Sequence, residues 1–550
     1  MKAKGLAYLF VVCGGGAASA GGLFLPGAGV VSTSRAGAAV ASADDAEAIA
    51  INPAGIAKTS GTKITIGIVA IDYLMSFQRS GTYDPTKDAT SYAGMPYPKI
   101  TNAASPPLGI GAYQPVPVIG IVSDLNNVIP HLHAGFGVYA PNAYPFRNMN
   151  NVNGKPYFVK TDLGYDFPTF GAAPPPTRYD IIEQEAAIIL PSLDLAYSIT
   201  PDLDVGVRGS LGIAQLKSTV AIMGLLNYAE DVQQDGVFAV DASSIVETGG
   251  LGVNYRIGPN IELGANYSLP IMINAKGTAH AVNAPGVTLA GAPISIEPVD
   301  ASMVRCQAGG TAAQLKACAD IELPMTAQLG GRWKFLDGKG KLRGDLEVDL
   351  DWEHWGAKCD YTTDVTCQNP SDYHVTVDAQ ITTPASTNAQ QLQPTLIQHG
   401  LQDTYGVRVG GSWTFDAGPT NSLVVRGGLA HDTRAAKSGW ERSDLDGAAR
   451  TMISAGGSYK LPRWSIDAGF GLILEGTRTN DRHCNPPDGN GCSGTGEAPV
   501  DGYNGTVPSR EGPDPTVPII PPGSQIEQPV NQGTYSSYYL LIMLGASTWF

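Results

Sequence analysis

The feature that most constrains the fold is a strict alternation of apolar and acidic side chains in residues 342–354. One face carries Leu346, Val348, Leu350 and Trp352, and the other carries Asp345, Glu347, Asp349 and Asp351. Successive residues of a β-strand point to opposite sides, so this strand separates an apolar medium from an aqueous one. Similar alternation recurs in residues 203–213, 261–267, 405–413 and 464–472, which predicts an all-β protein.

Short and long connections alternate between these segments. The short ones are rich in Gly, Pro, Asn and Asp, which favour turns, and the pattern matches the short periplasmic turns and long outer loops of bacterial barrels. We predict a transmembrane antiparallel β-barrel of about fourteen strands, an even number that leaves both barrel ends in the periplasm. The predicted strands are residues 62–78, 114–123, 131–140, 178–198, 203–221, 246–257, 261–280, 320–336, 341–355, 401–415, 422–433, 448–460, 464–477 and 535–550.

The first 20 residues have the organisation of a secretory signal peptide. Lys2 and Lys4 begin it, an apolar stretch follows at residues 6–12, and Ala18-Ser19-Ala20 forms an A-x-A cleavage site. The rest of the sequence contains no run of about 18 apolar residues, so it predicts no transmembrane helix. Only helices and closed barrels satisfy every backbone group in lipid. We therefore expect an exported protein that spans the bacterial outer membrane as a barrel.

Composition and charge narrow the function. The chain has a net charge of −15 and 15% charged residues, whereas a soluble domain carries about 25%. The acidic balance argues against nucleic acid as a partner, because a phosphate backbone requires a basic face. The 8 histidines are scattered and no cysteine pair has C-x-x-C spacing. The sequence therefore predicts no enzyme, no metal site and no cofactor.

The cysteines beyond the signal peptide fall into three close pairs, which are Cys306 with Cys318, Cys359 with Cys367, and Cys484 with Cys492. Closely spaced, even-numbered cysteines in an exported protein indicate local disulfides. Every pair falls in a predicted long loop and outside the predicted strands. A disulfide there would stabilise a segment that has no core of its own.

Residues 21–61, between the signal peptide (1–20) and the barrel (62–550), do not alternate. Small residues dominate this segment, and Asp44, Asp45 and Glu47 open a short possible helix that ends at Asn52-Pro53. Its apolar patches and few charges favour a plug packed inside the lumen. The other interpretation is a loose periplasmic tail.

This segment resembles the N-terminal hatch of the FadL family of outer-membrane transporters. The resemblance rests on Ser34-Arg35-Ala36-Gly37, Ala43-Asp44-Asp45-Ala46 and Asn52-Pro53-Ala54-Gly55, and it continues in order downstream at residues 134–141, 190–197 and 321–324. It implies a monomer in outer-membrane lipid and lipopolysaccharide. It also implies binding of a hydrophobic small-molecule ligand, a long-chain fatty acid or an aromatic hydrocarbon, at the outer face, and its release by movement of the hatch.

The resemblance further implies a kink in the third strand that opens a side gap toward the bilayer. Gly135 and Gly137 precede Pro141 there, and glycine weakens a strand while proline removes a ladder donor. The alternative is that these glycines only relieve crowding beneath the plug. After Pro141 the chain departs from the family pattern, because Asn142-Ala143 stands where an aromatic residue and a glycine are common.

Four residues are candidates for contacting the ligand, namely Leu23 and Phe24 in the hatch and Tyr139 and Phe146 near the top of the third strand. The alternative for each is that it only packs. Four arginines are expected to face the lumen, and they would either meet a ligand carboxylate or pair with lumen acids and hold the hatch. These are Arg208, Arg332, Arg408 and Arg426.

Three other functions stay open. A general diffusion porin would need an open polar lumen without a plug. A surface adhesin or structural barrel would bind a partner through outer loops, such as the proline-rich loop at residues 478–534. An outer-membrane lipase would need a catalytic triad, which the sequence does not show. Uptake of oleate against toluene, and ion conduction by the purified barrel, would separate these functions.

Overall fold

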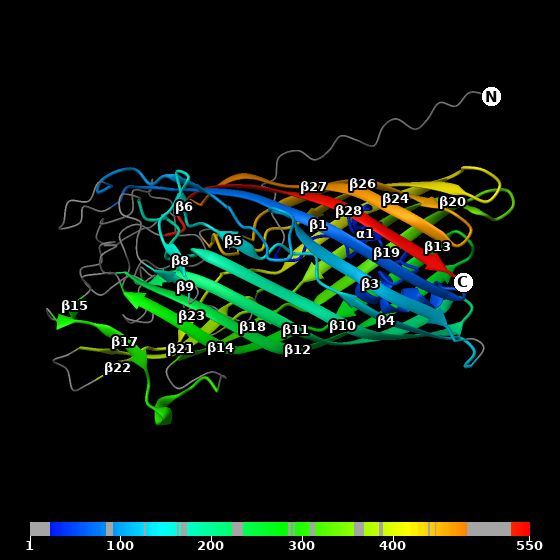
Figure 1. Cartoon of the computed structure of the whole chain (residues 1–550). Helices are drawn as coiled ribbons and strands as arrows, with labels where there is room; N and C mark the ends of the chain where they lie inside the picture. The colour runs from blue at the N-terminus through cyan, green and yellow to red at the C-terminus, as the bar shows by residue number, and fades with distance from the viewer. Residues whose placement is uncertain are drawn as a thin grey trace.

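In the computed structural model, the chain forms a closed antiparallel barrel of fourteen strands, as the alternation predicted (Figure 1). The structure describes residues 22–550 except 84–91, 126–127, 162–163, 167–172, 223–234, 284–287, 290–291, 308–313, 357–367, 384–388, 438–439, 446 and 481–529. The first strand, β1 (Thr62–Arg79), pairs with the last, β28 (Gly533–Trp549), from Lys63 to Arg79. This pairing closes the ring, so the wall has no free sheet edge there.

The other wall strands follow in chain order, each antiparallel to its neighbour. They are β3 (Gln114–Asp124), β4 (Leu132–Tyr139), β10 (Glu183–Thr200), β11 (Leu203–Ile222), β12 (Gly236–Ile257), β13 (Ile261–Ser268) continued by β14 (Ile271–Asn283), β18 (Leu315–Leu323) continued by β19 (Thr326–Leu336), β20 (Leu342–Glu353), β24 (Thr404–Asp416), β25 (Ser422–Asp432), β26 (Arg450–Lys460) and β27 (Trp464–Asn480). Each predicted strand corresponds to one of these.

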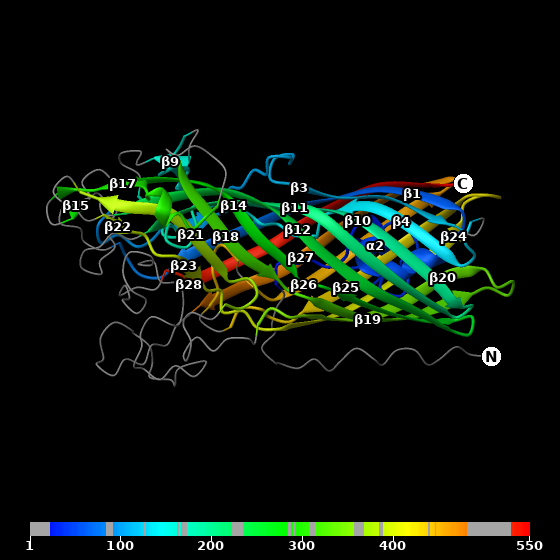
Figure 2. The ribbon, with the colours of Figure 1, turned by 90° about the horizontal axis from the view of Figure 1, so that it is seen from below.

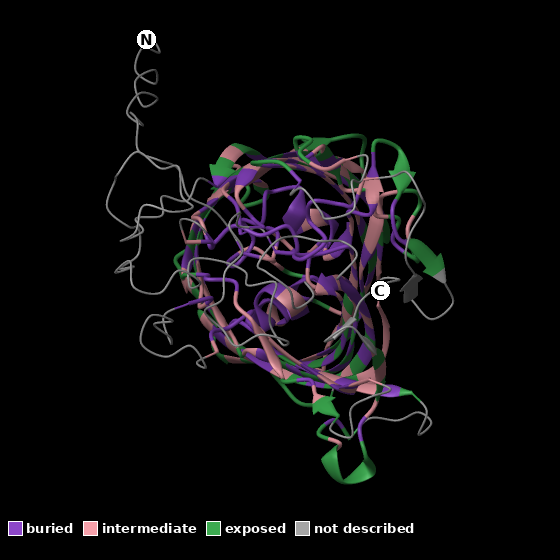
Figure 3. Cartoon of the chain, turned by 90° about the vertical axis from the view of Figure 1, so that its left-hand side faces the viewer, coloured by how far each residue is buried: buried purple, intermediate pink, exposed green. Residues whose placement is uncertain are grey.

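Alternation along a strand separates lipid-facing from lumen-facing side chains. On β20, Leu346, Val348 and Leu350 are 46%, 43% and 53% exposed, whereas Glu347 and Asp349 are fully buried. The view along the barrel shows the same separation, with buried segments gathered inside the ring (Figure 3). Among the described helices, none is long and apolar enough to cross a membrane.

Small elements gather at the outer end of the barrel (Figures 1 and 2). They are β2 (Lys99–Thr101), β5 (Phe146–Asn148), β6 (Asn151–Val152), β7 (Lys155–Pro156), β8 (Val159–Thr161), β9 (Gly164–Asp166), β15 (Thr288–Leu289), β16 (Ala292–Pro293), β17 (Ser295–Pro298), η3 (Ala301–Met303), β21 (Tyr373–Thr382), β22 (Gln390–Gln391) and β23 (Thr395–Ile397). One of them corrects the sequence prediction, because β21 falls in residues 356–400, which were expected to be loop. It pairs with β18 and extends the wall outward beyond the end of β20.

One of the three predicted cysteine pairs is confirmed, but its expected location in a loop is wrong. Cys306 and Cys318 form a disulfide, but Cys318 lies within β18 instead of a loop. The wall continues further outward than the predicted start of this strand at residue 320, so the bond joins an outer loop to a strand. The pairs Cys359–Cys367 and Cys484–Cys492 lie outside the described residues.

The N-terminal segment, residues 22–61, lies inside the barrel (Figures 1 and 3). It contains α1 (Val30–Thr33), α2 (Ala48–Ile51) and the 3-10 helix η1 (Pro53–Lys58). Most of its side chains are buried, although helices this short are unstable alone. Contacts with the barrel therefore supply the stability of this segment.

Candidate ligand-binding site

The acidic face of β20 holds the N-terminal segment in the lumen. Arg35 donates from Nη1 to Asp345 Oδ1 and from Nη2 to Glu347 Oε2, both at 2.9 Å and both buried. Glu347 Oε1 also accepts a hydrogen bond from the backbone nitrogen of Ala41 at 2.6 Å. Asp349 Oδ2 accepts from the nitrogens of Ala39 and Val40 at 2.8 and 3.0 Å. Charge-assisted hydrogen bonds are stronger than neutral ones, so this face is the main anchor of the segment.

The Asn52-Pro53-Ala54 motif fixes the end of the same segment. Asn52 Oδ1 accepts from the nitrogen of Ala54 at 3.1 Å and thereby caps η1, while Pro53 occupies the first turn. Asn52 Nδ2 donates to the carbonyl of Val40 at 2.7 Å. The motif lies directly against the wall, because a Cβ added at Gly252 of β12 would stand 2.1 Å from Asn52 Oδ1.

The Asp44-Asp45 motif lies next to the start of the barrel. Lys63, at the beginning of β1, has its Nζ 3.5 Å from Asp44 Oδ1 and 3.3 Å from Asp45 Oδ2. The Asn52-Pro53-Ala54 motif, the Asp44-Asp45 motif and Arg35 thus all contact barrel strands. Sequence reasoning placed these residues in one segment but could not say which strands they meet.

The wall is interrupted beside the third strand. β4 ends at Tyr139, which pairs with Val118 of β3 and Leu190 of β10. Beyond it, residues 140–145 join neither ladder, and their one backbone hydrogen bond to β3 or β10 runs from Ala140 to Pro117 at 3.3 Å. Pairing with β10 resumes at β5, residues 146–148. An interruption at this place is what a side gap requires.

Gly135 and Gly137 of β4 give the N-terminal segment room to approach. A Cβ added at Gly135 or Gly137 would lie 3.2 or 3.0 Å from Cδ1 of Ile49 in α2. This close approach supports the interpretation that the glycines relieve crowding beneath the plug. The departure of the chain from the sheet occurs later, between Tyr139 and Pro141.

Asn142, where the chain departs from the family pattern, connects this part of the wall to the N-terminal segment. Its carbonyl accepts from the nitrogen of Leu25 at 2.8 Å. Its Nδ2 donates to the carbonyl of Gly27 at 2.8 Å and lies 3.2 Å from Thr33 Oγ1. The chain leaving β4 therefore turns inward and binds the start of the segment.

A cavity of about 150 Å³ lies between the N-terminal segment and the wall. Its apolar lining includes Phe24 and Tyr139, two of the four predicted ligand contacts, together with Leu25, Leu190, Leu269 and Ile271. Its polar lining includes Asn142, Arg208, Asn266, Gln328, Asp351 and Arg408. A mostly apolar pocket with a few fixed polar groups is the usual form of a small-molecule site.

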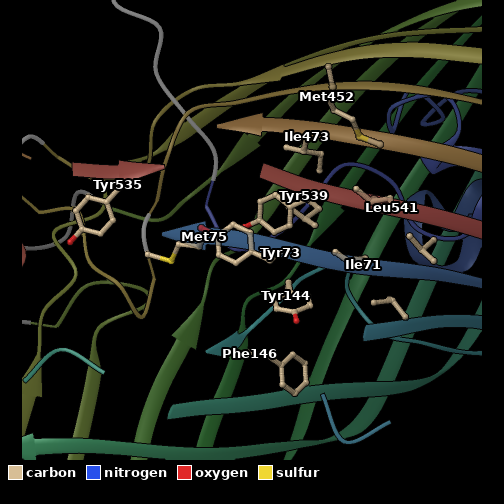
Figure 4. Packing of buried hydrophobic residues seen from close by; sticks show 14 of the residues in the cluster. Ile71, Tyr73, Met75, Tyr144, Phe146, Met452, Ile473, Tyr535, Tyr539 and Leu541 are labelled. Carbon is tan, nitrogen blue, oxygen red and sulfur yellow. The ribbon is translucent and has the colours of Figure 1, made fainter. Parts of the chain in front are cut away.

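The other two predicted contacts, Leu23 and Phe146, do not line this cavity. Leu23 packs against the same apolar cluster as Phe24, Tyr139 and Leu190. Phe146 belongs to a second apolar cluster in the outer half of the lumen, on the inner faces of β1, β27 and β28 (Figure 4). In that cluster the rings of Tyr144 and Phe146 meet edge to face with centroids 5.6 Å apart.

The four lumen arginines bind either the N-terminal segment or acidic side chains of the barrel wall. Arg208 donates to the carbonyls of Ile49 and Ala50 at 2.8 and 3.1 Å. The other three pair with acids: Arg332 with Glu262 and Asp345, Arg408 with Asp351, and Arg426 with Asp467. The expected pairing with lumen acids is confirmed for Arg332, Arg408 and Arg426, whereas Arg208 binds the N-terminal segment.

The described residues contain no group of three or more His, Cys, Asp or Glu placed to hold a metal ion. The sequence Asp444-Leu445-Asp446-Gly447 is similar to the start of a calcium loop but lacks its remaining ligands. The Asp444 carboxylate lies 2.9 Å from both Arg442 and His399. Sequence reasoning did not identify Gln328 or Trp352 as lining residues. For Asn266, the only sequence feature that indicated a position facing the lumen was its place on the polar face of an alternating strand.

Comparisons with known proteins agree with this architecture. Residues 11–490 match the family model described as outer membrane protein transport protein (OMPP1/FadL/TodX). A Pseudomonas aeruginosa FadL homologue matches with a TM-score of 0.61 and 13% identity, covering 96% of this chain and 100% of that one. The P. putida toluene transporter TodX and the Ralstonia pickettii toluene transporter TbuX match with TM-scores of 0.56 and 0.55, each at 13% identity and covering 96% of this chain and 99% of theirs. No curated protein matches the sequence.

Proposed function

Since the chain belongs to the FadL and TodX family of outer-membrane transport proteins, we propose that it carries small hydrophobic molecules inward and releases them by movement of its N-terminal segment. The observation that carries this proposal is the place of the cavity. It lies between the buried N-terminal segment and the end of β4, where the wall is interrupted. A ligand in it would touch both the part that blocks the lumen and the part that opens to the side.

The size of the cavity favours one of the two predicted substrate classes. A cavity of about 150 Å³ lined by apolar side chains accommodates benzene, and this cavity has about that volume. A long-chain fatty acid would also need space that the N-terminal segment or the outer apolar cluster fills. We therefore assign monoaromatic molecules to the cavity, with fatty acids as the second candidate. TodX and TbuX are described as toluene transporters.

The contacts support a proposed order of transport steps. Residues 21–61 act as a hatch, and Arg35 together with the carboxylates of Glu347 and Asp349 holds it closed. Asn142 joins the hatch to the chain segment beside the wall interruption. A shift of residues 25–33 would thus loosen residues 140–145 and widen the side gap, through which an apolar ligand enters the bilayer without crossing water.

The remaining assignments complete the proposal. Residues 1–20 are a cleaved signal peptide, the barrel at 62–550 works as a monomer, and its exposed apolar bands contact outer-membrane lipid and lipopolysaccharide. A porin would need an open lumen, whereas the buried segment occupies it. The adhesin alternative rests on residues 478–534, most of which lie outside the described residues.

Uptake tests the proposal. Cells that express the chain should take up radiolabelled toluene faster than cells that lack it, and oleate to a smaller extent. Purified barrel in planar bilayers should conduct ions poorly. Free ion conduction would favour a porin. Transport would be refuted if cells with the gene took up each label no faster than cells without it.

A further inference from the structure

The chain leaves the barrel wall between β2 and β3. The nitrogen of Asn102 donates to the carbonyl of Met75 in β1 at 2.8 Å, and pairing with β1 resumes at Gln114, opposite Ile71. Residues 103–113 connect these two points, and the blue chain that leads into β3 stands out from the side of the barrel (Figure 2). We call residues 103–113 the flap.

The flap consists of two tight turns with an apolar tip. The nitrogen of Gly109 donates to the carbonyl of Pro106 at 2.9 Å, and Ile110 and Tyr113 exchange backbone hydrogen bonds at 3.1 and 3.3 Å. At the tip, Leu108 is 77% exposed and Ile110 is 88% exposed. Apolar side chains are stabilised by removal from water, so acyl chains would be a better environment for this tip than solvent.

The flap joins β1 at the outer border of the lipid-facing band. Ile66 and Ile68 are exposed on the lipid-facing side of β1, and Leu74 on the same side pairs with Tyr538 of β28. Aromatic residues form girdles where the apolar band of a barrel ends. Asp72 shares this side of β1, and a charge that faces lipid is less costly near the interface than at the midplane. The flap therefore begins at the level where the outer leaflet meets its head groups.

The flap also borders the interruption of the wall beside β4. At the outer edge, Oδ1 of Asn102 accepts from the nitrogen of Asn148 at 2.9 Å and joins the base of the flap to β5. Inside the interruption, Tyr144 donates its hydroxyl to the carbonyl of Ala112 at 2.7 Å. In the part of the chain that the structure describes, no other hydrogen bond joins residues 105–112 to the rest of the protein.

The chain between β4 and β5 thus contacts the hatch and the flap at once. Asn142 donates to the carbonyl of Gly27 in the hatch at 2.8 Å, and two residues later Tyr144 binds the flap. A movement that releases Asn142 would also displace Tyr144. We propose that the flap covers the side gap from the lipid side with its tip among the acyl chains of the outer leaflet, and that the Tyr144 hydroxyl holds it closed until the hatch moves.

This inference rests on the side release in the proposed function, and the position of the tip is tested without transport. Leu108→Cys in purified full-length protein is labelled with the fluorophore NBD and placed in phosphatidylcholine vesicles, with labelled wild type as background. We expect phospholipids with doxyl groups on their acyl chains to quench this probe, and aqueous iodide to leave it bright. Lys155→Cys, exposed in the outer hairpin of β6 and β7, should show the opposite. Iodide quenching at both sites alike would overturn the inference.

The second test removes the hydroxyl that holds the flap. Tyr144→Phe keeps the ring that meets Phe146 edge to face, so packing is retained. Because the hydrogen bond opposes local opening, its loss should accelerate hydrogen–deuterium exchange of the flap about fivefold. Tyr255→Phe on β12 is the matched control, since its hydroxyl is exposed and bonds none of the described residues, and it should leave exchange unchanged. Exchange in Tyr144→Phe at the wild-type rate would overturn the role of the hydroxyl.

Uptake of radiolabelled toluene separates this inference from the proposed function. If the flap covers the exit, cells that express Tyr144→Phe should take up toluene faster than cells that express the wild type. Faster exchange of the flap with unchanged uptake would show that the flap does not cover the exit, and would overturn the inference while wild-type transport stands. A wild type that takes up no toluene would refute the proposed function, whereas quenching and exchange would still decide where the flap lies and what holds it.

Discussion

Arg35 and Asp345 are 310 positions apart in the sequence and form a buried ion pair with 2.9 Å between Nη1 and Oδ1. The guanidinium also reaches Glu347, so one side chain joins the N-terminal segment to two carboxylates of β20. Removing one partner of a buried pair leaves the other charge unpaired in a medium that solvates it poorly. The N-terminal segment is therefore held by a contact whose loss should measurably weaken its docking.

Arg35→Gln should loosen the hatch. We expect the docking of the N-terminal segment to weaken by about 3 kcal/mol, because Glu347 loses the one ion pair that it forms within the described part of the chain, while Asp345 keeps Arg332. Limited proteolysis near residue 35 and the ion conductance of the barrel should both increase. Arg343→Gln is the matched control, since Arg343 pairs with Asp337 and Asp416 outside the lumen. An unchanged hatch in Arg35→Gln would contradict the role of this pair.

Hatch docking should weaken at alkaline pH. Burial and the neighbouring carboxylate of Asp45 raise the pKa of Glu47 from 4.5 to about 8, against the hydrogen bonds it accepts from the nitrogens of Val31 and Ser32. The folded pKa lies above the unfolded one, so this contribution is complete below pH 4.5 and is lost as the pH rises through about 8. Arg426 of β25 also faces Glu47 and moderates the effect.

The measurement is the conductance of purified barrels at pH 6 and pH 9. We expect more frequent openings at pH 9 in the wild type. Glu47→Gln keeps the size of the side chain and cannot ionise, so it should abolish this difference. A difference of the same size in Glu47→Gln would assign the pH dependence to another group.

Locking the hatch should stop transport. A Cβ added at Gly469 of β27 would lie 3.3 Å from Cβ of Ser34, close to the separation of about 3.8 Å found in disulfides. Ser34→Cys with Gly469→Cys should abolish uptake under oxidising conditions and recover it on reduction. Wild-type protein treated in the same way controls for its native cysteines. Full uptake by the cross-linked protein would contradict this prediction, because it would show that transport does not require this part of the hatch to move.

The glycines of β4 can be assigned by a compensation experiment. Gly137→Ala brings a methyl group to 3.0 Å from Cδ1 of Ile49, and such overpacking costs about 1–3 kcal/mol. Ile49→Val in the same chain should restore most of the unfolding temperature and the uptake, because valine lacks the Cδ1 atom that the new methyl group meets and costs little in a buried position. If uptake stays low while stability recovers, flexibility of the strand is the property that Gly137 supplies.

The sequence did not predict every part of the wall. β12 begins at Gly236, ten residues before the predicted start at 246, and β21 was not expected at all. In both segments the inner face packs against outer loops, so it is apolar instead of polar and the alternation disappears. Phe238 and Ile381 belong to one such cluster. A contrast between faces requires lipid on one side and water or polar groups on the other.

The sequence by itself determined the barrel, because side chains that alternate in polarity assign each strand residue to lipid or lumen without knowledge of any distant partner. The acidic face of β20 was visible in this way before its partners were known. Only the tertiary structure decided which groups those carboxylates bind, where β4 leaves the sheet, and which side chains meet around the cavity. These features arise from contacts such as that of Asn142 with Gly27, which are 115 positions apart. The local sequence does not indicate such a partner, because the two residues come close only when the ring has closed.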